Sequence, residues 1–208
     1  MIKADRISSI ILFGPPGTGK TSIARIIANT TKASFYKLNA VTAGVKDIKQ
    51  VVEDTQNVFI NPNGKSVLFV DEIHRFNKAQ QDALLPYVED GTVVLIGATT
   101  ENPFFEVNKA LISRSTVFML EPLKKEHIMK IIRMAVSDKE RGLGTLKIDI
   151  KDDAVSLLAE MSSGDARIAL NALELAILTT EATRMRPFYT LQGPFMREKT
   201  RSSSPDAL

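Results

Sequence analysis

The apolar side chains of residues 7–121 form short runs that alternate with stretches of helical periodicity. The runs are rich in β-branched residues, as in strands that are buried on both faces of a parallel sheet. Strands are expected at residues 9–13, 34–38, 67–70, 92–98 and 116–120. Helices are expected between them, at residues 20–30, 45–57, 78–88 and 107–112. Strands that alternate with helices favour an α/β fold with a parallel sheet.

The pattern changes at Pro122. Residues 122–183 carry helical patterns, the first at 124–137 and the others expected to start at caps formed by Asp152 and Asp165. Residues 184–208 show no periodicity and are rich in proline and serine, which predicts an atypical, disordered tail. The expected organisation is therefore an α/β core at 1–121, a small α-helical lid domain at 122–183 and a tail at 184–208.

One segment of the α/β core carries a specific chemical signal. It reads Gly14, Pro15, Pro16, Gly17, Thr18, Gly19, Lys20 and Thr21, the phosphate-binding loop G-x-x-x-x-G-K-[ST]. The loop lies between an expected strand and an expected helix, where glycines allow the backbone to turn and the helix N-terminus favours an anion. Lys20 can reach the β- and γ-phosphates, and the Thr21 hydroxyl can ligate Mg²⁺. The motif predicts ATP and Mg²⁺ as ligands; the alternative is an ordinary glycine turn.

Two adjacent carboxylates, Asp71 and Glu72, follow the third expected strand. Asp71 can hold Mg²⁺ through water, and Glu72 can orient and polarise an attacking water molecule. Such a pair also occurs in solvated turns, but the phosphate loop earlier in the chain favours the functional interpretation. Because the pair points to attack by water, a small-molecule P-loop kinase is the least favoured alternative.

Spacing alone leaves three further candidates open. Thr100 follows the fourth expected strand, where its hydroxyl could contact the γ-phosphate or the water; a strand-end turn is the alternative. Arg114 precedes the fifth expected strand, and Arg167 begins a helical pattern. Both arginines could equally be solvated surface residues.

Composition changes this picture little. Hydrophobic residues make up 44% of the chain and charged residues 25%, an ordinary globular balance. The net charge of +3 resides in residues 184–208, so any nucleic-acid surface elsewhere is a local patch. The chain contains no cysteine, which excludes disulfides and thiolate metal sites. No apolar stretch approaches the ~20 residues of a membrane span. A cytoplasmic location without a membrane partner is expected.

The order of several stretches resembles AAA+ ATPases: GPPGTGKT, VLFVDEIH, GATTENP, SRS and GDARIALNALE. The stretches VTAGVKD and DEIHRFNKAQQD resemble, more narrowly, the RarA/MgsA family of replication-associated recombination proteins, called Werner-helicase-interacting protein in eukaryotes. The resemblance covers residues 8–180. It implies a P-loop NTPase (AAA+) core with a parallel sheet, followed by a small α-helical lid domain.

The resemblance implies roles for residues within one subunit. Asp71 and Glu72 resemble the Walker B pair, and Thr100 resembles sensor 1. Asn39, at the end of the second expected strand, corresponds to a polar switch that restrains Glu72. These assignments are carried over from the family.

Two arginines take roles that depend on the lid or on assembly. Arg114 resembles the arginine finger, which enters the site of a neighbouring subunit, and Arg167 resembles sensor 2, which reaches the γ-phosphate from the lid. Family members begin roughly 40 residues earlier, by an order-of-magnitude alignment. They also continue into a helical oligomerisation region. The chain is therefore expected to be an AAA+ core trimmed at both ends, from a family that forms homo-oligomers.

The implied function is ATP-dependent remodelling of DNA in replication-fork maintenance, recombination and repair. Implied partners are single-stranded, gapped or forked DNA and replication and single-strand-binding proteins, with a nucleoid-associated location in a bacterium. One alternative is a nucleotide-binding interaction module that hydrolyses ATP poorly. Another, within AAA+, is a clamp-loader subunit or branch-migration motor, against which the VTAGVKD stretch argues.

Overall fold

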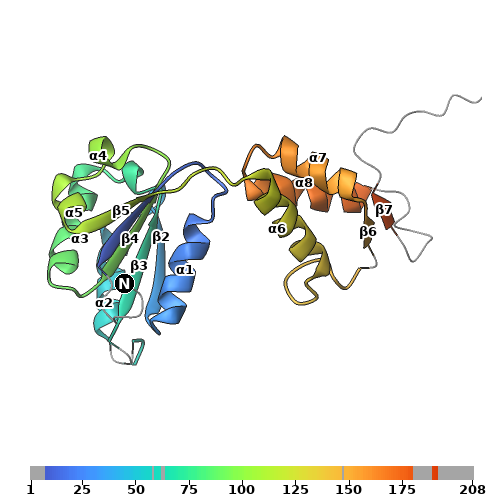
Figure 1. The fold of residues 1–208 in the computed structure, drawn as a ribbon. Coiled ribbons are helices and arrows are strands. Elements are labelled where there is room, and N and C mark those ends of the chain that lie inside the picture. The colour runs from blue at the N-terminus through green and yellow to red at the C-terminus, as the bar shows by residue number, and fades with distance from the viewer. Residues whose placement is uncertain (1–7, 58, 62–63, 147, 180–188, 192–208) are drawn as a thin grey trace, which may run out of the picture. The chain divides into compact units, whose positions relative to one another are not determined.

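The computed structural model describes residues 8–57, 59–61, 64–146, 148–179 and 189–191. The chain divides into two compact units, Met1–Pro122 and Leu123–Leu208. The first unit is built on a sheet and the second mainly from helices (Figure 1). Within the part of the chain that the structure describes, no helix is long and apolar enough to cross a membrane.

A parallel sheet with the strand order β2-β3-β4-β1-β5 forms the centre of the first unit. Its strands are β1 (Ser9–Phe13), β2 (Ser34–Asn39), β3 (Ser66–Asp71), β4 (Val94–Thr99) and β5 (Ser115–Met119). Each expected strand is present, with small shifts at its ends. Because all strands run in the same direction, the residues that follow them lie at one edge of the sheet. The α/β class predicted from the alternating pattern is confirmed.

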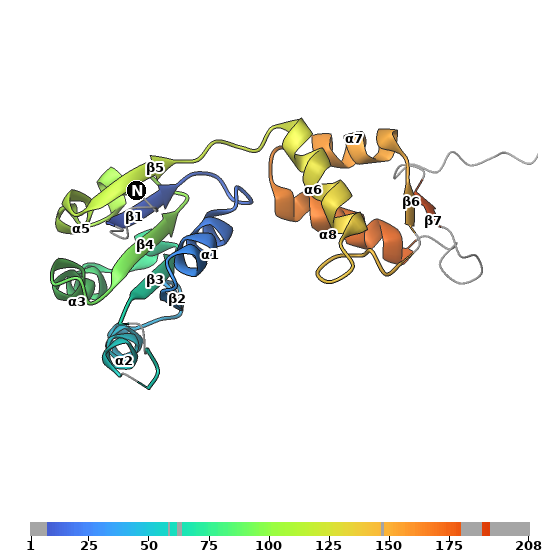
Figure 2. The same ribbon diagram turned by 60° about the horizontal axis from the view of Figure 1, so that its bottom comes forward.

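Helices cover both faces of this sheet (Figure 2). Helix α1 (Lys20–Thr30) packs against one face. Helices α2 (Val45–Gln56) and α3 (Lys78–Glu89) pack against the other, together with the short helix η2 (Ile73–Arg75). This arrangement leaves little of the central strands in contact with water, so their sequences read as unbroken apolar runs.

The alternation of side chains along each strand builds two separate cores. Ile10 and Leu12 of β1 pack with α1, whereas Ile11 between them packs with the helices of the opposite face. In β3, Phe69 lies on the α1 face and Leu68 on the other. Burial of each such large side chain contributes roughly 1.5–3 kcal/mol. Each central strand is therefore held by packing on both of its faces.

Two short helices follow β4 where one was expected at residues 107–112. They are α4 (Pro103–Glu106) and α5 (Lys109–Ser113). The side-chain oxygens of Asn102 and Asn108 each accept a backbone N–H from two residues later, at 3.1 and 2.9 Å. Each asparagine therefore caps the helix that follows it. The expected helix corresponds to α5 with shifted bounds, and α4 was not expected because the cap at Asn102 was missed.

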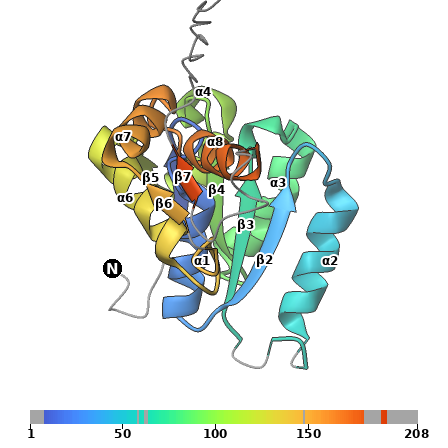
Figure 3. The same cartoon turned by 90° about the vertical axis from the view of Figure 1, so that its right-hand side faces the viewer.

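Three helices of the second unit pack around one apolar cluster (Figure 3). They are α6 (Lys125–Ser137), α7 (Asp152–Met161) and α8 (Ala166–Thr179). Their buried side chains are Ile128, Ile132, Val155, Leu158, Ala159, Ala169, Leu173 and Ile177. Two short strands, β6 (Ile148–Ile150) and β7 (Tyr189–Leu191), pair in parallel.

The structure corrects two expectations in the second unit. Asp152 is the first residue of α7, and Lys151 occupies the cap position before it. Strand β7 lies within residues 184–208, which were predicted to be disordered, and its partner β6 was not expected. Two three-residue strands have no periodicity to read, since their pairing comes from segments distant in the sequence. The rest of 184–208 lies outside the described residues.

The Tyr36 hydroxyl of β2 is buried without a hydrogen-bond partner among the described residues. Burial, and to a lesser extent the charge of Asp54, raise the pKa of Tyr36. A Tyr36→Phe variant is expected to keep its free energy of unfolding or gain up to about 1 kcal/mol, because an unpaired buried hydroxyl costs desolvation energy. Urea unfolding measures this. A clear loss of stability would show that the hydroxyl is bonded in solution.

Candidate active site

The phosphate loop has the backbone that its glycines predict. Gly17 and Gly19 have φ angles of 70° and 89°, in the left-handed region that other residues avoid. Gly14 packs so tightly that an added Cβ would lie 2.3 Å from the carbonyl oxygen of Leu120. Its N–H donates to the carbonyl oxygen of Thr99 over 3.1 Å, which ties the loop to the end of β4.

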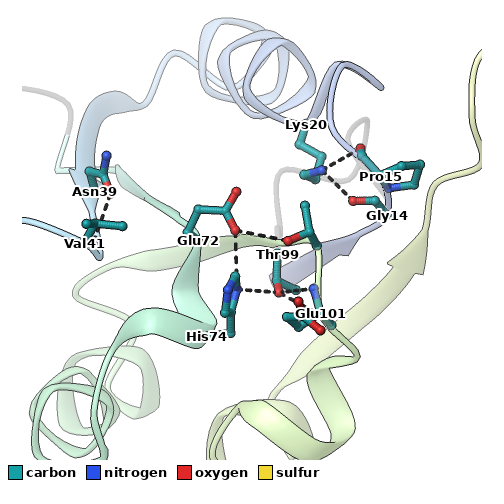
Figure 4. A network of polar contacts seen from close by, with 10 residues as sticks. Gly14, Pro15, Lys20, Asn39, Val41, Glu72, His74, Thr99 and Glu101 are labelled. Atoms are coloured by element: carbon teal, nitrogen blue, oxygen red, sulfur yellow. Dashed lines mark hydrogen bonds and ion pairs between the residues drawn. The ribbon is translucent and has the colours of Figure 1, made fainter. Parts of the chain in front are cut away.

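The Lys20 side chain folds back onto the first residues of the loop. The residue is only 6% exposed, and its Nζ donates to the carbonyl oxygens of Gly14 at 2.7 Å and Pro15 at 2.9 Å. The Thr18 hydroxyl donates to Pro15 as well, at 2.9 Å. Figure 4 shows the Lys20 ammonium at the concave side of the loop. A buried ammonium at this place in the loop is positioned to contact an anion of high charge.

The start of α1 also suits an anion. Its cap residue, Gly19, has no side chain to accept the first N–H groups, and the first turn holds no acidic residue. Those N–H groups and the helix dipole therefore favour a negative ligand. Thr21 directly follows Lys20 and carries a hydroxyl in the same first turn of α1. The loop residues fit a nucleotide phosphate chain.

The predicted carboxylate pair lies at the carboxyl end of β3. In the sheet, β3 is next to β4, and β4 is next to β1, the strand that precedes the phosphate loop. Asp71 is the last residue of β3, and its Oδ2 lies 3.5 Å from Nζ of Lys37 on β2. Glu72 comes next with φ 55° and ψ 46°, a left-handed conformation that is uncommon for a residue other than glycine. Lys32 and Ser163 have similar φ angles of 53° and 49°, so this conformation is not confined to the candidate site. The Asp71 carboxylate and the Thr21 hydroxyl are oxygen ligands of the kind that Mg²⁺ prefers.

Glu72 contacts the end of β4 in two ways (Figure 4). The Thr100 hydroxyl donates to Glu72 Oε2 over 3.4 Å. Nδ1 of His74 lies 3.4 Å from the same oxygen and 2.9 Å from Oγ1 of Thr99. The structure thus brings together Glu72 and Thr100, two of the residues that the sequence singled out. His74 and Thr99 were missed, although a histidine two positions after the candidate carboxylate Glu72 was a signal available in the sequence.

Close packing places η2 against β4. Ile73 is fully buried, and Gly97 of β4 leaves the room that its side chain occupies. A Cβ at Gly97 would lie 3.0 Å from Cδ1 of Ile73 and 2.7 Å from Cδ1 of Ile11. Because Ile73 is anchored in this way, the residues on either side of it are held at the carboxyl end of β4.

Asn39 does not reach Glu72. Its Oδ1 accepts the backbone N–H of Val41 at 3.0 Å, and its carbonyl oxygen accepts the N–H of Ala43. The side chain stabilises the turn after β2, as asparagine commonly does. The predicted contact between Asn39 and Glu72 is therefore not made, and the switch role stays a prediction.

Arg114 lies at the amino ends of the strands, whereas the phosphate loop lies at their carboxyl ends. It immediately precedes β5, whose first residue pairs with Ser9 at the start of β1, whereas the loop follows Phe13. A five-residue strand separates these ends by about 13 Å. The guanidinium bonds Glu89 Oε1 at 2.6 Å and the carbonyl oxygen of Ala110 at 3.0 Å. Within one chain the structure does not bring Arg114 to the loop.

Arg167 belongs to the second unit, where it is exposed in the first turn of α8. Its backbone N–H donates to Asp165 Oδ1 at 2.7 Å, so Asp165 caps this helix as predicted. The sensor 2 role stays a prediction.

Comparisons with known proteins fit this geometry. The model of the ATPase family associated with various cellular activities (AAA) matches residues 10–123. A model of the AAA C-terminal domain matches residues 143–200, and so extends into the segment 184–208.

Individual relatives give the same answer. Replication-associated recombination protein A of Escherichia coli is 49% identical over 84% of this chain, and ATPase WRNIP1 of Dictyostelium discoideum is 45% identical over 85%. The aligned region is 39% of the first relative and 20% of the second, so the chain spans less than half of each. The solved structure of the Thermotoga maritima RuvB Holliday junction branch migration motor superposes with a TM-score of 0.68 and 29% identity. The match covers 85% of this chain and 56% of the RuvB chain. The chain belongs to the AAA family of ATPases and, within it, to the family of replication-associated recombination protein A.

Proposed function

We propose that this chain binds ATP with Mg²⁺ and hydrolyses it to remodel DNA during replication-fork maintenance, recombination and repair. The observation that carries the proposal is the meeting of the phosphate loop, the Asp71–Glu72 pair and Thr100 at one edge of the sheet. The names of the similar proteins in Escherichia coli and Dictyostelium discoideum support a role in replication and recombination.

Each residue has a separate task in this proposal. The loop N–H groups and Lys20 bind the phosphates, and Thr21 and Asp71 hold Mg²⁺, which would neutralise charge on the phosphates. Glu72 accepts a proton from the attacking water and orients it. Thr100 donates a hydrogen bond to the water or to the γ-phosphate. Positioning and charge stabilisation then supply most of the rate enhancement.

Assembly completes the site. Arg114 would enter the site of an adjacent copy of the chain, and Arg167 keeps the sensor 2 role that the resemblance implies. The proposed partners are single-stranded, gapped or forked DNA and replication and single-strand-binding proteins. The proposed location is the cytoplasm, at the nucleoid in a bacterium. ATPase assays with and without single-stranded and gapped DNA test this function. A rate that stays at background under all these conditions, with no nucleotide bound, contradicts it.

A Lys20→Ala variant is expected to weaken ATP binding by about ten- to hundred-fold, because one charge-assisted contact to phosphate is worth roughly 1.5–3 kcal/mol. Titration of a fluorescent ATP analogue measures the affinity. Lys32→Ala, which removes an exposed lysine just after α1, is the control. Equal affinity of Lys20→Ala and wild type would remove the phosphate-loop assignment.

Two alternatives make different predictions in the same assays. A nucleotide-gated interaction module would bind ATP but show no turnover that rises with protein concentration. A branch-migration motor, which the RuvB likeness brings into consideration, would be stimulated more by four-way junctions than by gapped DNA. The proposed function predicts stimulation by gapped or single-stranded DNA and a rate per subunit that rises with concentration.

A further inference from the structure

His74 has contacts that neither the phosphate-binding motifs nor the family resemblance assigned to a function. The side chain is 8% exposed, and its Nδ1 lies between Thr99 Oγ1 at 2.9 Å and Glu72 Oε2 at 3.4 Å. Both contacts involve one nitrogen. The position of the ring proton therefore decides what both contacts do.

The other partners of Thr99 place that proton on Nδ1. The Thr99 hydroxyl donates to the carbonyl oxygen of Glu101 at 3.1 Å and accepts the Glu101 N–H at 3.0 Å. We assign this proton to the Glu101 carbonyl oxygen, which leaves the imidazole Nδ1–H to donate to Thr99 Oγ1. The carboxylate of Glu72 requires the same tautomer, since a nitrogen lone pair facing it would be repulsive. With this assignment one Nδ1–H is shared between Thr99 Oγ1 at 2.9 Å and Glu72 Oε2 at 3.4 Å.

Resting on the ATP hydrolysis proposed above, we propose that His74 is a positioning residue for Glu72. Thr99 fixes the ring, and the Nδ1–H holds the carboxylate in the orientation that a general base needs. Two successive residues at the end of β4 therefore hold Glu72. Thr100 contacts it directly, and Thr99 acts through His74. The buried Ile73 between Glu72 and His74 keeps both residues at this place.

A pair of substitutions separates this role from simple packing. His74→Asn keeps an N–H donor near the place of Nδ1, whereas His74→Leu removes the donor and keeps apolar bulk. His74→Leu is expected to lower kcat about ten- to hundred-fold with an ATP affinity within about two-fold of wild type, because a misplaced catalytic group costs rate rather than binding. His74→Asn is expected to retain most of the turnover. His127→Leu, at an exposed position of α6, is the matched control.

Combination with Glu72→Gln tests the route of the effect. If His74 acts through the carboxylate, adding His74→Leu to Glu72→Gln will lower kcat no further. If His74→Leu does not fold, Thr99→Val compared with Thr99→Ser asks the same question, because serine keeps the hydroxyl that anchors the ring. Circular dichroism and thermal melting show which variants are folded.

A second measurement does not depend on turnover. The chain has two histidines, so long-range ¹H–¹⁵N spectra of the imidazole rings, with His127→Leu for assignment, identify the His74 signals. The nucleotide-free protein is expected to show the Nδ1–H tautomer of His74. An Nε2–H tautomer would overturn the proposal whatever the ATPase rate.

The outcomes distinguish this inference from the function on which it rests. If the wild-type protein neither binds nor hydrolyses ATP, the proposed function fails. The imidazole spectra then still test whether His74 carries the Nδ1–H that the contact to Glu72 requires. If the wild type hydrolyses ATP and His74→Leu keeps its rate, or His74→Asn is as slow as His74→Leu, the positioning role fails and the function stands.

Discussion

Arg114→Ala is expected to lower ATP turnover by about 10³-fold or more in an assembled protein, because transition-state charge on the transferred phosphoryl group would lose its neutralising cation. In an isolated protomer the same variant should bind nucleotide as the wild type does. The reason is geometric: Arg114 precedes β5, about 13 Å along the sheet from its own phosphate loop. The expected effect therefore depends on a neighbouring copy, whose site Arg114 would enter.

Mixed assemblies provide the measurement. Lys20→Ala subunits lack one half of the shared site and Arg114→Ala subunits lack the other. Mixing the two variants should therefore restore some intact interfaces and some turnover. Lys109→Ala removes another exposed cation of α5 and is the matched control. No recovery in well-mixed assemblies would mean that Arg114 acts within its own chain, or that it only holds Glu89 and the end of α5.

Glu72→Gln is expected to lower ATP hydrolysis by about 10²–10⁴-fold while the affinity for ATP stays the same, as for the loss of a general base. The glutamine keeps the shape of the side chain and can still accept the Thr100 hydrogen bond. It cannot take a proton from water. Single-turnover hydrolysis and titration of a fluorescent ATP analogue measure the two quantities separately.

Two further variants define the role of Glu72. Asp71→Asn is expected to raise the Mg²⁺ concentration needed for binding and hydrolysis together, since Asp71 is the proposed metal ligand. Glu53→Gln, on the exposed surface of α2, controls for the loss of one negative charge. If Asp71→Asn and Glu72→Gln weaken binding equally, the proposed separation of their tasks is wrong.

The local features of the chain could be read from the sequence. The bounds of β1 and α1 agree with the expected ranges 9–13 and 20–30, because each element has an unambiguous apolar period and the glycine loop separates them. The phosphate loop and the carboxylate pair after β3 were visible for a similar reason: their spacing is fixed along the chain. The parallel order of elements followed from the alternation of strands and helices.

Contacts between distant segments could not be read in this way. The pairing of His74 with Thr99 joins residues 25 positions apart, and no periodicity records it. Asn39 ends β2 beside Asp71, yet its oxygen caps the local turn and does not reach Glu72, since the nearer backbone N–H of Val41 competes for it. The parallel pairing of β6 with β7 also depends on a partner far along the chain.

The amino-acid sequence by itself determined which elements form and which residues can bind phosphate, because side-chain periodicity and loop chemistry act over a few residues. Only the tertiary structure decided how those residues meet. The strand order places β1 between β4 and β5, and this order puts the loop beside Thr99 and Arg114 at the far edge. Packing of Ile73 over Gly97 then brings His74 to Thr99. These relations arise from close packing of strands distant in sequence, which has no local signature.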